Sequence, residues 1–147
     1  MRPHPYLRAY MAGIVVPTVF LLLVMMPIYV YFRFYLEVPS QFVIGLPGRP
    51  LEQAIVFPMV VVPNAWGVWN MAHLALRSRM RIPLAVHGSL LPLLLMPFGI
   101  ALARAFDLFT IQMQFALPMV PIGMGVYYLA WKFLVGFLNE EIGIASA

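Results

Sequence analysis

The sequence predicts an all-α integral membrane protein: a bundle of four transmembrane helices, kinked at prolines, with both termini in the cytoplasm. Two observations on composition predict the class. Of the 147 residues, 63% are hydrophobic and only 10% are charged, whereas about a quarter are charged in soluble domains. The third observation is that charges divide the chain into four apolar runs. Each run is close to the ~20 residues that a helix needs to cross a hydrocarbon core of ~30 Å. We therefore treat residues 1–147 as a single transmembrane domain.

Charged residues bound the first three predicted spans sharply. These spans cover residues 9–32, 53–76 and 82–103. The fourth is less well bounded, because its apolar run opens with Thr110, Gln112 and Gln114, and we place it at about 116–138. The one substantial loop, 33–51, is apolar enough that we expect it to lie on the outer membrane surface. Residues 105–115 are interpreted as a shorter interfacial segment of the same kind.

The distribution of basic residues predicts the orientation. Six fall on one side of the four spans and three on the other. The larger group is Arg2, Arg8, Arg77, Arg79, Arg81 and Lys132, and the smaller is Arg33, Arg49 and Arg104. Because cytoplasmic loops carry the excess of Lys and Arg, the larger group and both termini are predicted to be cytoplasmic. We expect Trp131, beside Lys132, to act as an aromatic anchor at this interface, and we expect the membrane to be a bacterial inner membrane.

Composition also excludes several classes of function. The chain has no cysteine, which removes disulfides, thiolate catalysis and cysteine-ligated metals. Its net charge of +4 comes from Arg and Lys scattered between apolar runs. This pattern is typical of membrane flanks rather than of a nucleic-acid surface, so we expect the lipid bilayer as a partner and no nucleic acid.

Nine of the fourteen prolines fall inside the predicted spans. They are Pro17, Pro27, Pro58, Pro63, Pro83, Pro92, Pro97, Pro118 and Pro121. An interior proline frees a carbonyl and bends the helix, which either shapes packing or opens a binding pathway; we favour packing. The densest case, 118–125, is expected to be locally unwound. Small residues four apart, such as Ala9 and Gly13, are typical of close helix packing.

A polar side chain at membrane depth is costly and is therefore a functional candidate. The candidates for ligand binding or for lining a pathway are Asn64, Trp66, Asn70, His73 and His87. At 100° per residue Trp66, Asn70 and His73 share one face of the second span, and Asn64 points roughly the opposite way. No Asp, Glu, Arg or Lys lies deep in a span, so proton-coupled antiport through a buried carboxylate has no carrier, unlike in the small four-helix drug exporters.

His73 and His87 form the sharpest constellation. His73 lies four residues before Arg77 and His87 six after Arg81, so the hairpin brings both imidazoles to nearly the same depth. Two imidazoles are ligands for haem or a metal ion. Helix axes 8 to 10 Å apart leave little room for haem between the rings, and no third ligand reaches that depth. We therefore expect no cofactor and keep haem or metal binding as an alternative.

Three hypotheses for function follow. The favoured one is a small non-catalytic membrane protein that forms a homo-oligomer or serves as an accessory subunit of a larger membrane complex. The second is a transporter or channel for a neutral or hydrophobic solute, with Asn64 and Asn70 lining the path. The third is a haem- or metal-binding redox protein using His73 and His87. No residue is assigned a catalytic role, and enzymatic activity is not expected.

Overall fold

The computed structural model describes residues 4–35, 42–43, 46–47, 51–105 and 113–144. Over these residues the chain is helical apart from turns and from β1 (Phe42–Val43) and β2 (Leu46–Pro47), a short antiparallel pair. The helices are α1 (Pro5–Val30), α2 (Leu51–Leu76), α3 (Leu84–Ser89), α4 (Leu91–Ala105), α5 (Met113–Ala130) and α6 (Gly136–Glu141). Two π-helical segments, Tyr31–Tyr35 and Trp131–Val135, follow α1 and α5.

Three described segments are long and apolar enough to cross a membrane. They are Pro5–Val30, Leu84–Ala101 and Leu117–Glu141, and they confirm the predicted all-helical membrane class. α2 covers the predicted second span of 53–76, and the predicted third span is divided into α3 and α4 at Leu90. Most of the 33–51 loop, and residues 106–112 of the predicted 105–115 segment, lie outside the described residues.

The prolines disturb the helices less than the sequence suggested. Pro118 and Pro121 both lie within regular α5, so the expected local unwinding of 118–125 is wrong. The helix departs from α geometry only later, where the amide of Gly136 donates to the carbonyl of Trp131 across the π-helical segment. Such segments are usually single wide turns inserted into an α-helix. This wide turn therefore sets the direction in which α6 leaves α5.

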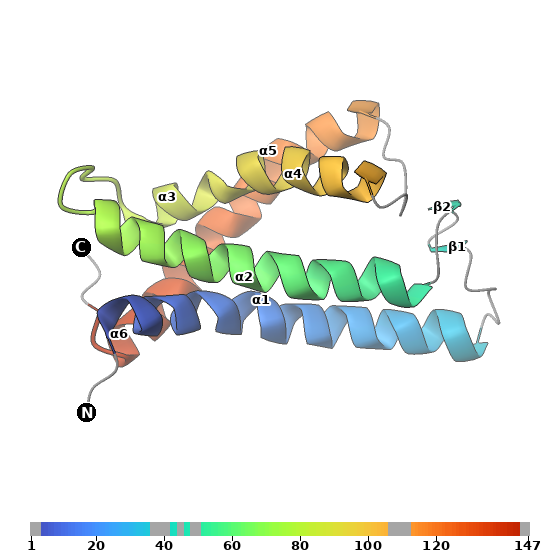
Figure 1. Cartoon of the computed structure of the whole chain (residues 1–147), viewed down its shortest axis with the longest axis horizontal. Helices are drawn as coiled ribbons and strands as arrows, with labels where there is room; N and C mark the ends of the chain where they lie inside the picture. The colour runs from blue at the N-terminus through green and yellow to red at the C-terminus, as the bar shows by residue number, and fades with distance from the viewer. Residues whose placement is uncertain (1–3, 36–41, 44–45, 48–50, 106–112, 145–147) are drawn as a thin grey trace.

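α1 and α2 run antiparallel, side by side, along the length of the molecule (Figure 1). Their backbones meet at Gly13, where a Cβ would lie 2.6 Å from the carbonyl oxygen of Trp66 and 2.8 Å from the Cα of Gly67. Across the same contact, the ring of Tyr10 lies over Gly67. The spacing of Ala9 and Gly13 predicts close helix packing, and the structure places that contact at Gly13, between two helices of one chain.

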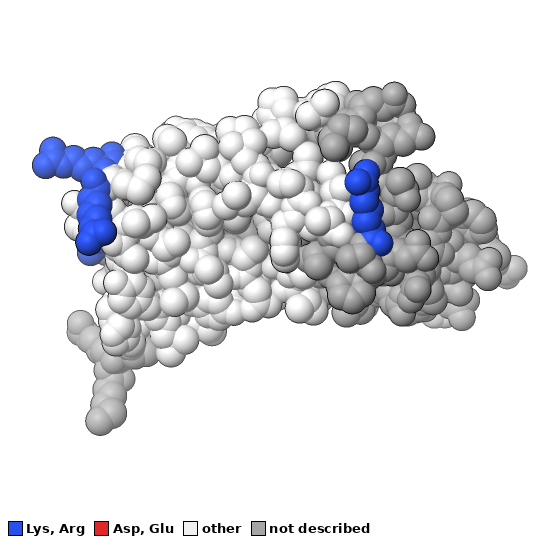
Figure 2. Space-filling model, turned by 45° about the horizontal axis from the view of Figure 1, so that its top comes forward, with Lys and Arg blue, Asp and Glu red and all other residues white. Residues whose placement is uncertain are grey.

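Three parts of the chain lie at one end of the molecule: α6, the beginning of α1 and the turn between α2 and α3. α5 crosses behind α2 and α1 and continues into α6, beside the beginning of α1 (Figure 1). The α2–α3 turn lies at that same end. Figure 2 shows Lys and Arg gathered at one end of the displayed face and a smaller basic group beside the grey residues toward the other end, with no described charged residue on the surface between them. This charge distribution matches a molecule whose middle lies in hydrocarbon.

The core lies where α2, α3 and the α5–α6 region meet. It is formed by Trp66, Leu84, Leu91, Trp131 and Val135. The Trp66 ring centroid is 5.3 Å from that of Trp131. Trp131, expected at the membrane interface, is 0% exposed, because the missing side chain of Gly88 leaves the space its ring occupies. The buried position shows that Trp131 is a packing residue rather than a headgroup anchor.

Candidate functional site

Asn70 and Asn139 form a reciprocal amide pair in the interior. The side-chain NH₂ of Asn70 donates to the Asn139 side-chain oxygen at 2.9 Å and to the carbonyl oxygen of Ala9 at 2.7 Å. The NH₂ of Asn139 donates back to the Asn70 side-chain oxygen at 3.2 Å. Asn70 is 1% exposed and Asn139 3%. We call these two side chains and the Ala9 carbonyl the amide junction; it ties α1, α2 and α6 together.

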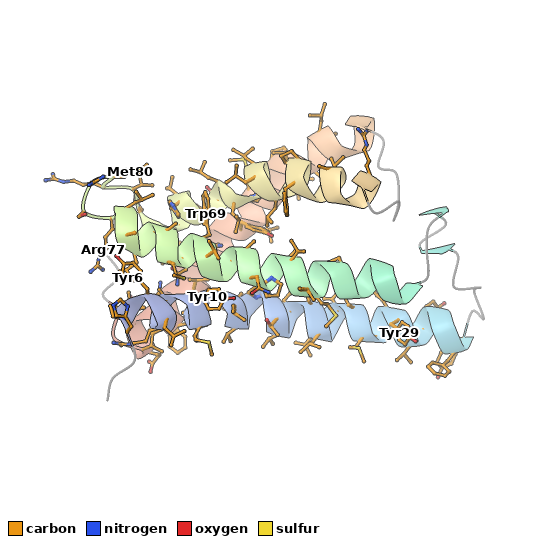
Figure 3. The ribbon with its side chains drawn as sticks, viewed as in Figure 1. Tyr6, Tyr10, Tyr29, Trp69, Arg77 and Met80 are labelled. Carbon is orange, nitrogen blue, oxygen red and sulfur yellow. The ribbon has the colours of Figure 1, made fainter. Side chains whose placement is uncertain are left out.

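The structure brings His73 and His87 into contact, with ring centroids 4.9 Å apart and planes tilted by 55°. The other neighbour of His87 is Trp69, whose ring stacks on it with centroids 4.6 Å apart. The indole N–H of Trp69 also donates to the backbone carbonyl of His87 at 2.8 Å. Figure 3 shows Trp69 between α2 and the α3–α4 pair. The three rings therefore form one contact group, with His87 between Trp69 and His73, that joins the two helices of the hairpin.

The contact between the two imidazole rings limits what they can coordinate. Rings in mutual contact leave no room for a macrocycle between them, so haem held between His73 and His87 does not fit this arrangement. The Nδ1 atom of His87 is buried without a hydrogen-bond partner in the described structure. Among the residues that the structure describes, no group of three or more His, Asp or Glu side chains is placed to hold a metal ion.

A small recess lies beside the amide junction at the end of the molecule that carries the α2–α3 turn. Its volume of about 10 Å³ is comparable with the ~10–15 Å³ needed for one water. The residues lining it are Ala9, Asn70, His73, Leu74, Arg77, Leu84, Asn139 and Ile144. The recess therefore suits a water bridging polar side chains and not an organic substrate.

Asn64 lies apart from this group. It is exposed on α2, where its side-chain oxygen accepts a hydrogen bond from the hydroxyl of Tyr10 on α1. Its NH₂ donates to the carbonyl oxygen of Val60 at 2.7 Å. Figure 3 shows Tyr10 between α1 and α2. Asn64 and Asn70 thus point to different sides of α2, as the helical spacing predicts.

Arg2 lies outside the described residues, and the other basic residues predicted to mark the cytoplasmic interface lie at helix ends or on the surface. Arg77, Arg79 and Arg81 are all exposed in a turn closed by amides of Arg79 and Met80 that donate to the carbonyl of Leu76. Figure 3 places Arg77 and Met80 at the same end as Tyr6. Lys132 is also exposed, with its ammonium 5.2 Å from the centre of the Phe133 ring. Arg8 is half-buried.

Sequence reasoning identified Asn70, His73 and His87 but missed one partner in each of the two interior groups. Asn70 is among the sequence candidates, whereas Asn139, just after the predicted fourth span of 116–138, is not. His73 and His87 were paired correctly in space, but the Trp69 ring that holds His87 was not identified. Comparisons with protein-family models, with curated proteins and with solved structures find no match.

Proposed function

We propose that this chain is a four-span inner-membrane protein of bacteria that acts as a non-catalytic oligomeric or accessory subunit. The fourth crossing in this proposal is α2. The observation that supports it is the use of the interior polar groups. Asn70 and Asn139 bond to each other and to the α1 backbone, and Trp69 bonds to the α3 backbone. These contacts join helices, which is what polar groups do in a packed membrane bundle.

The transport hypothesis depends on Asn64 and Asn70 lining one path. The two amides lie on different sides of α2, and Asn70 uses its NH₂ and its oxygen within the amide junction. The position of Asn70 therefore favours a structural role over solute binding. The redox hypothesis retains only the contact between His73 and His87 as support.

Native purification tests the proposed role. A chromosomally tagged chain, extracted in mild detergent, is expected to migrate in a complex larger than one chain and to co-purify with stoichiometric copies of itself or of other membrane proteins. Migration as a single chain in several mild detergents and in native nanodiscs would contradict the proposal.

The absence of cysteine in the sequence makes the proposed topology straightforward to test. Ser78 lies in the basic turn and Tyr35 in the π-helical segment after α1, and both are exposed. In intact spheroplasts, we expect Tyr35→Cys to react with a membrane-impermeant maleimide and Ser78→Cys to react only after lysis. The reverse pattern would invert the orientation, and reaction of both in intact cells would contradict the number of crossings.

A further inference from the structure

Asn64 places an exposed amide at the middle of a membrane-length helix. It lies twelve residues before the end of α2 at Leu76 and thirteen after its beginning at Leu51. At 1.5 Å per residue it is about 18 Å from one end and about 20 Å from the other. Polar side chains at this depth almost always face protein or a water-filled cavity. An exposed amide there indicates that another protein surface covers it.

The face that carries Asn64 is directed away from the core of the chain. Asn64 and the core residue Trp66 are two residues apart, which corresponds to about 160° around the helix. Val60 and Val68, one turn before and one turn after Asn64, lie on the same face and are 56% and 58% exposed. Asn64 is therefore the centre of an outward apolar strip, which we call the Asn64 face: Val60, Asn64 and Val68.

Counting hydrogen bonds shows what Asn64 can still bind. An amide side chain offers two N–H donors and two acceptor lone pairs. In the described structure one donor goes to Val60 and one lone pair receives the Tyr10 hydroxyl. One donor and one lone pair are left. A second amide with one donor and one lone pair remaining can pair with them in both directions. Asn70 and Asn139 already form such a reciprocal pair within this chain.

We propose that the Asn64 face binds the same face of a second copy of this chain, with the two Asn64 amides hydrogen-bonded across a twofold axis. This inference rests on the proposed membrane role and names its partner. Two copies in one membrane share an orientation, so the axis runs along the membrane normal and each residue near it meets its own counterpart. Across such an axis, the remaining N–H of each Asn64 can donate to the remaining lone pair of the other Asn64, and no further residue is needed.

Single cysteines provide the test, because the sequence has no cysteine to react in the background. Val68→Cys reports on the Asn64 face. Val126→Cys on α5 is the matched control, because the two valines are 58% and 57% exposed. Both variants are oxidised with copper phenanthroline in native membranes at equal expression. We expect several-fold more disulfide-linked dimer from Val68→Cys, because a disulfide requires Cα atoms about 4.4–6.8 Å apart.

The role of the amide is tested in the Val68→Cys background. Asn64→Leu has a similar volume but no polar atoms, and we expect it to weaken self-association by roughly 3- to 30-fold, the range for a membrane hydrogen bond. Tyr10→Phe removes only the hydroxyl that donates to Asn64 within the chain and is expected to preserve dimerisation. Thermal unfolding of the detergent-solubilised monomer shows whether the Asn64→Leu variant still folds. If it does not fold, Asn64→Gln serves as the second variant, and because it keeps a side-chain amide we expect it to retain part of the dimer.

The outcomes separate this inference from the proposed role. Equal cross-linking of Val68→Cys and Val126→Cys, or an undiminished dimer in a folded Asn64→Leu variant, overturns the inference. If native purification still gives a complex with other proteins, the accessory role stands and only the identity of the covering partner is wrong. A chain that is monomeric in both experiments contradicts both proposals.

Discussion

The contact between α1 and α2 at Gly13 gives the sharpest prediction of stability. In Gly13→Ala the new methyl group would lie 2.6 Å from the Trp66 carbonyl oxygen and 2.8 Å from the Gly67 Cα. Ordinary contact begins near 3.4 Å, so the helices must separate by roughly 0.8 Å, the difference between that distance and 2.6 Å. The contacted atoms are backbone, and no change of rotamer relieves the overlap.

The size of the effect follows from two opposing contributions. Forcing a methyl group into a packed interior costs about 1–3 kcal/mol, and alanine gains about 1 kcal/mol over glycine as a helix former. Because a backbone contact is near the upper end of the first range, we expect Gly13→Ala to lower the free energy of unfolding by about 1–2 kcal/mol. Gly125→Ala is the control, because nothing lies within 4 Å of the added methyl group. It should be neutral or raise stability by up to about 1 kcal/mol.

The assay is reversible unfolding by SDS in mixed micelles, followed by tryptophan fluorescence, which reports on the core residues Trp66 and Trp131. The two variants are expected to differ from each other by about 1–3 kcal/mol, with Gly13→Ala the less stable of the two. If Gly13→Ala is as stable as Gly125→Ala, the close approach of α1 to α2 is wrong, and so is the packing derived from it.

Three other predictions concern the interior contacts. In a double-mutant cycle, Asn70→Ala and Asn139→Ala should show a coupling free energy of about 1–2 kcal/mol in SDS unfolding; additive effects would contradict the amide junction. Gly88→Ala places a methyl group where the Trp131 ring lies, so the ring is displaced from its buried position. The free energy of unfolding should fall by about 1–3 kcal/mol and the tryptophan emission should move to longer wavelength. An unchanged spectrum would contradict the burial of Trp131. His87→Phe keeps an aromatic ring against Trp69, so it should preserve the native complex and lower the free energy of unfolding by less than about 1.5 kcal/mol. A Soret band or stoichiometric metal that is present in the parent and lost in this variant would favour the redox hypothesis instead.

The sequence predicts the helices well because their length and apolarity are local properties. It also predicts that His73 and His87 lie at nearly the same depth, because both are counted from one short turn, and the structure adds the contact between their rings. It could not predict that Asn70 pairs with Asn139, since the two lie 69 residues apart and no local pattern relates them. The only available signal was that Asn139 is an amide among charged and apolar neighbours at the end of a span.

The position of Trp131 shows a second limit. An aromatic residue beside a lysine near the end of a span has the same local pattern whether it faces headgroups or the core. The deciding partner, Gly88, is on another helix and leaves the space that the ring fills. Regular α5 through Pro118 and Pro121 is a related case. Proline density predicts lost hydrogen bonds but does not predict where the helix bends.

The π-helical segment Trp131–Val135 affects how this chain can tolerate changes in length. Its wide turn, closed from Gly136 to Trp131, sets the rotation of everything that follows. Such a wide turn holds one residue more than an α-turn, so deleting a single residue there would close it to regular α-helix and leave Asn139 facing α2. Inserting a residue would instead turn α6 by about 100° and move Asn139 off the α2 side. Insertions in this stretch should therefore be far more damaging than a single deletion.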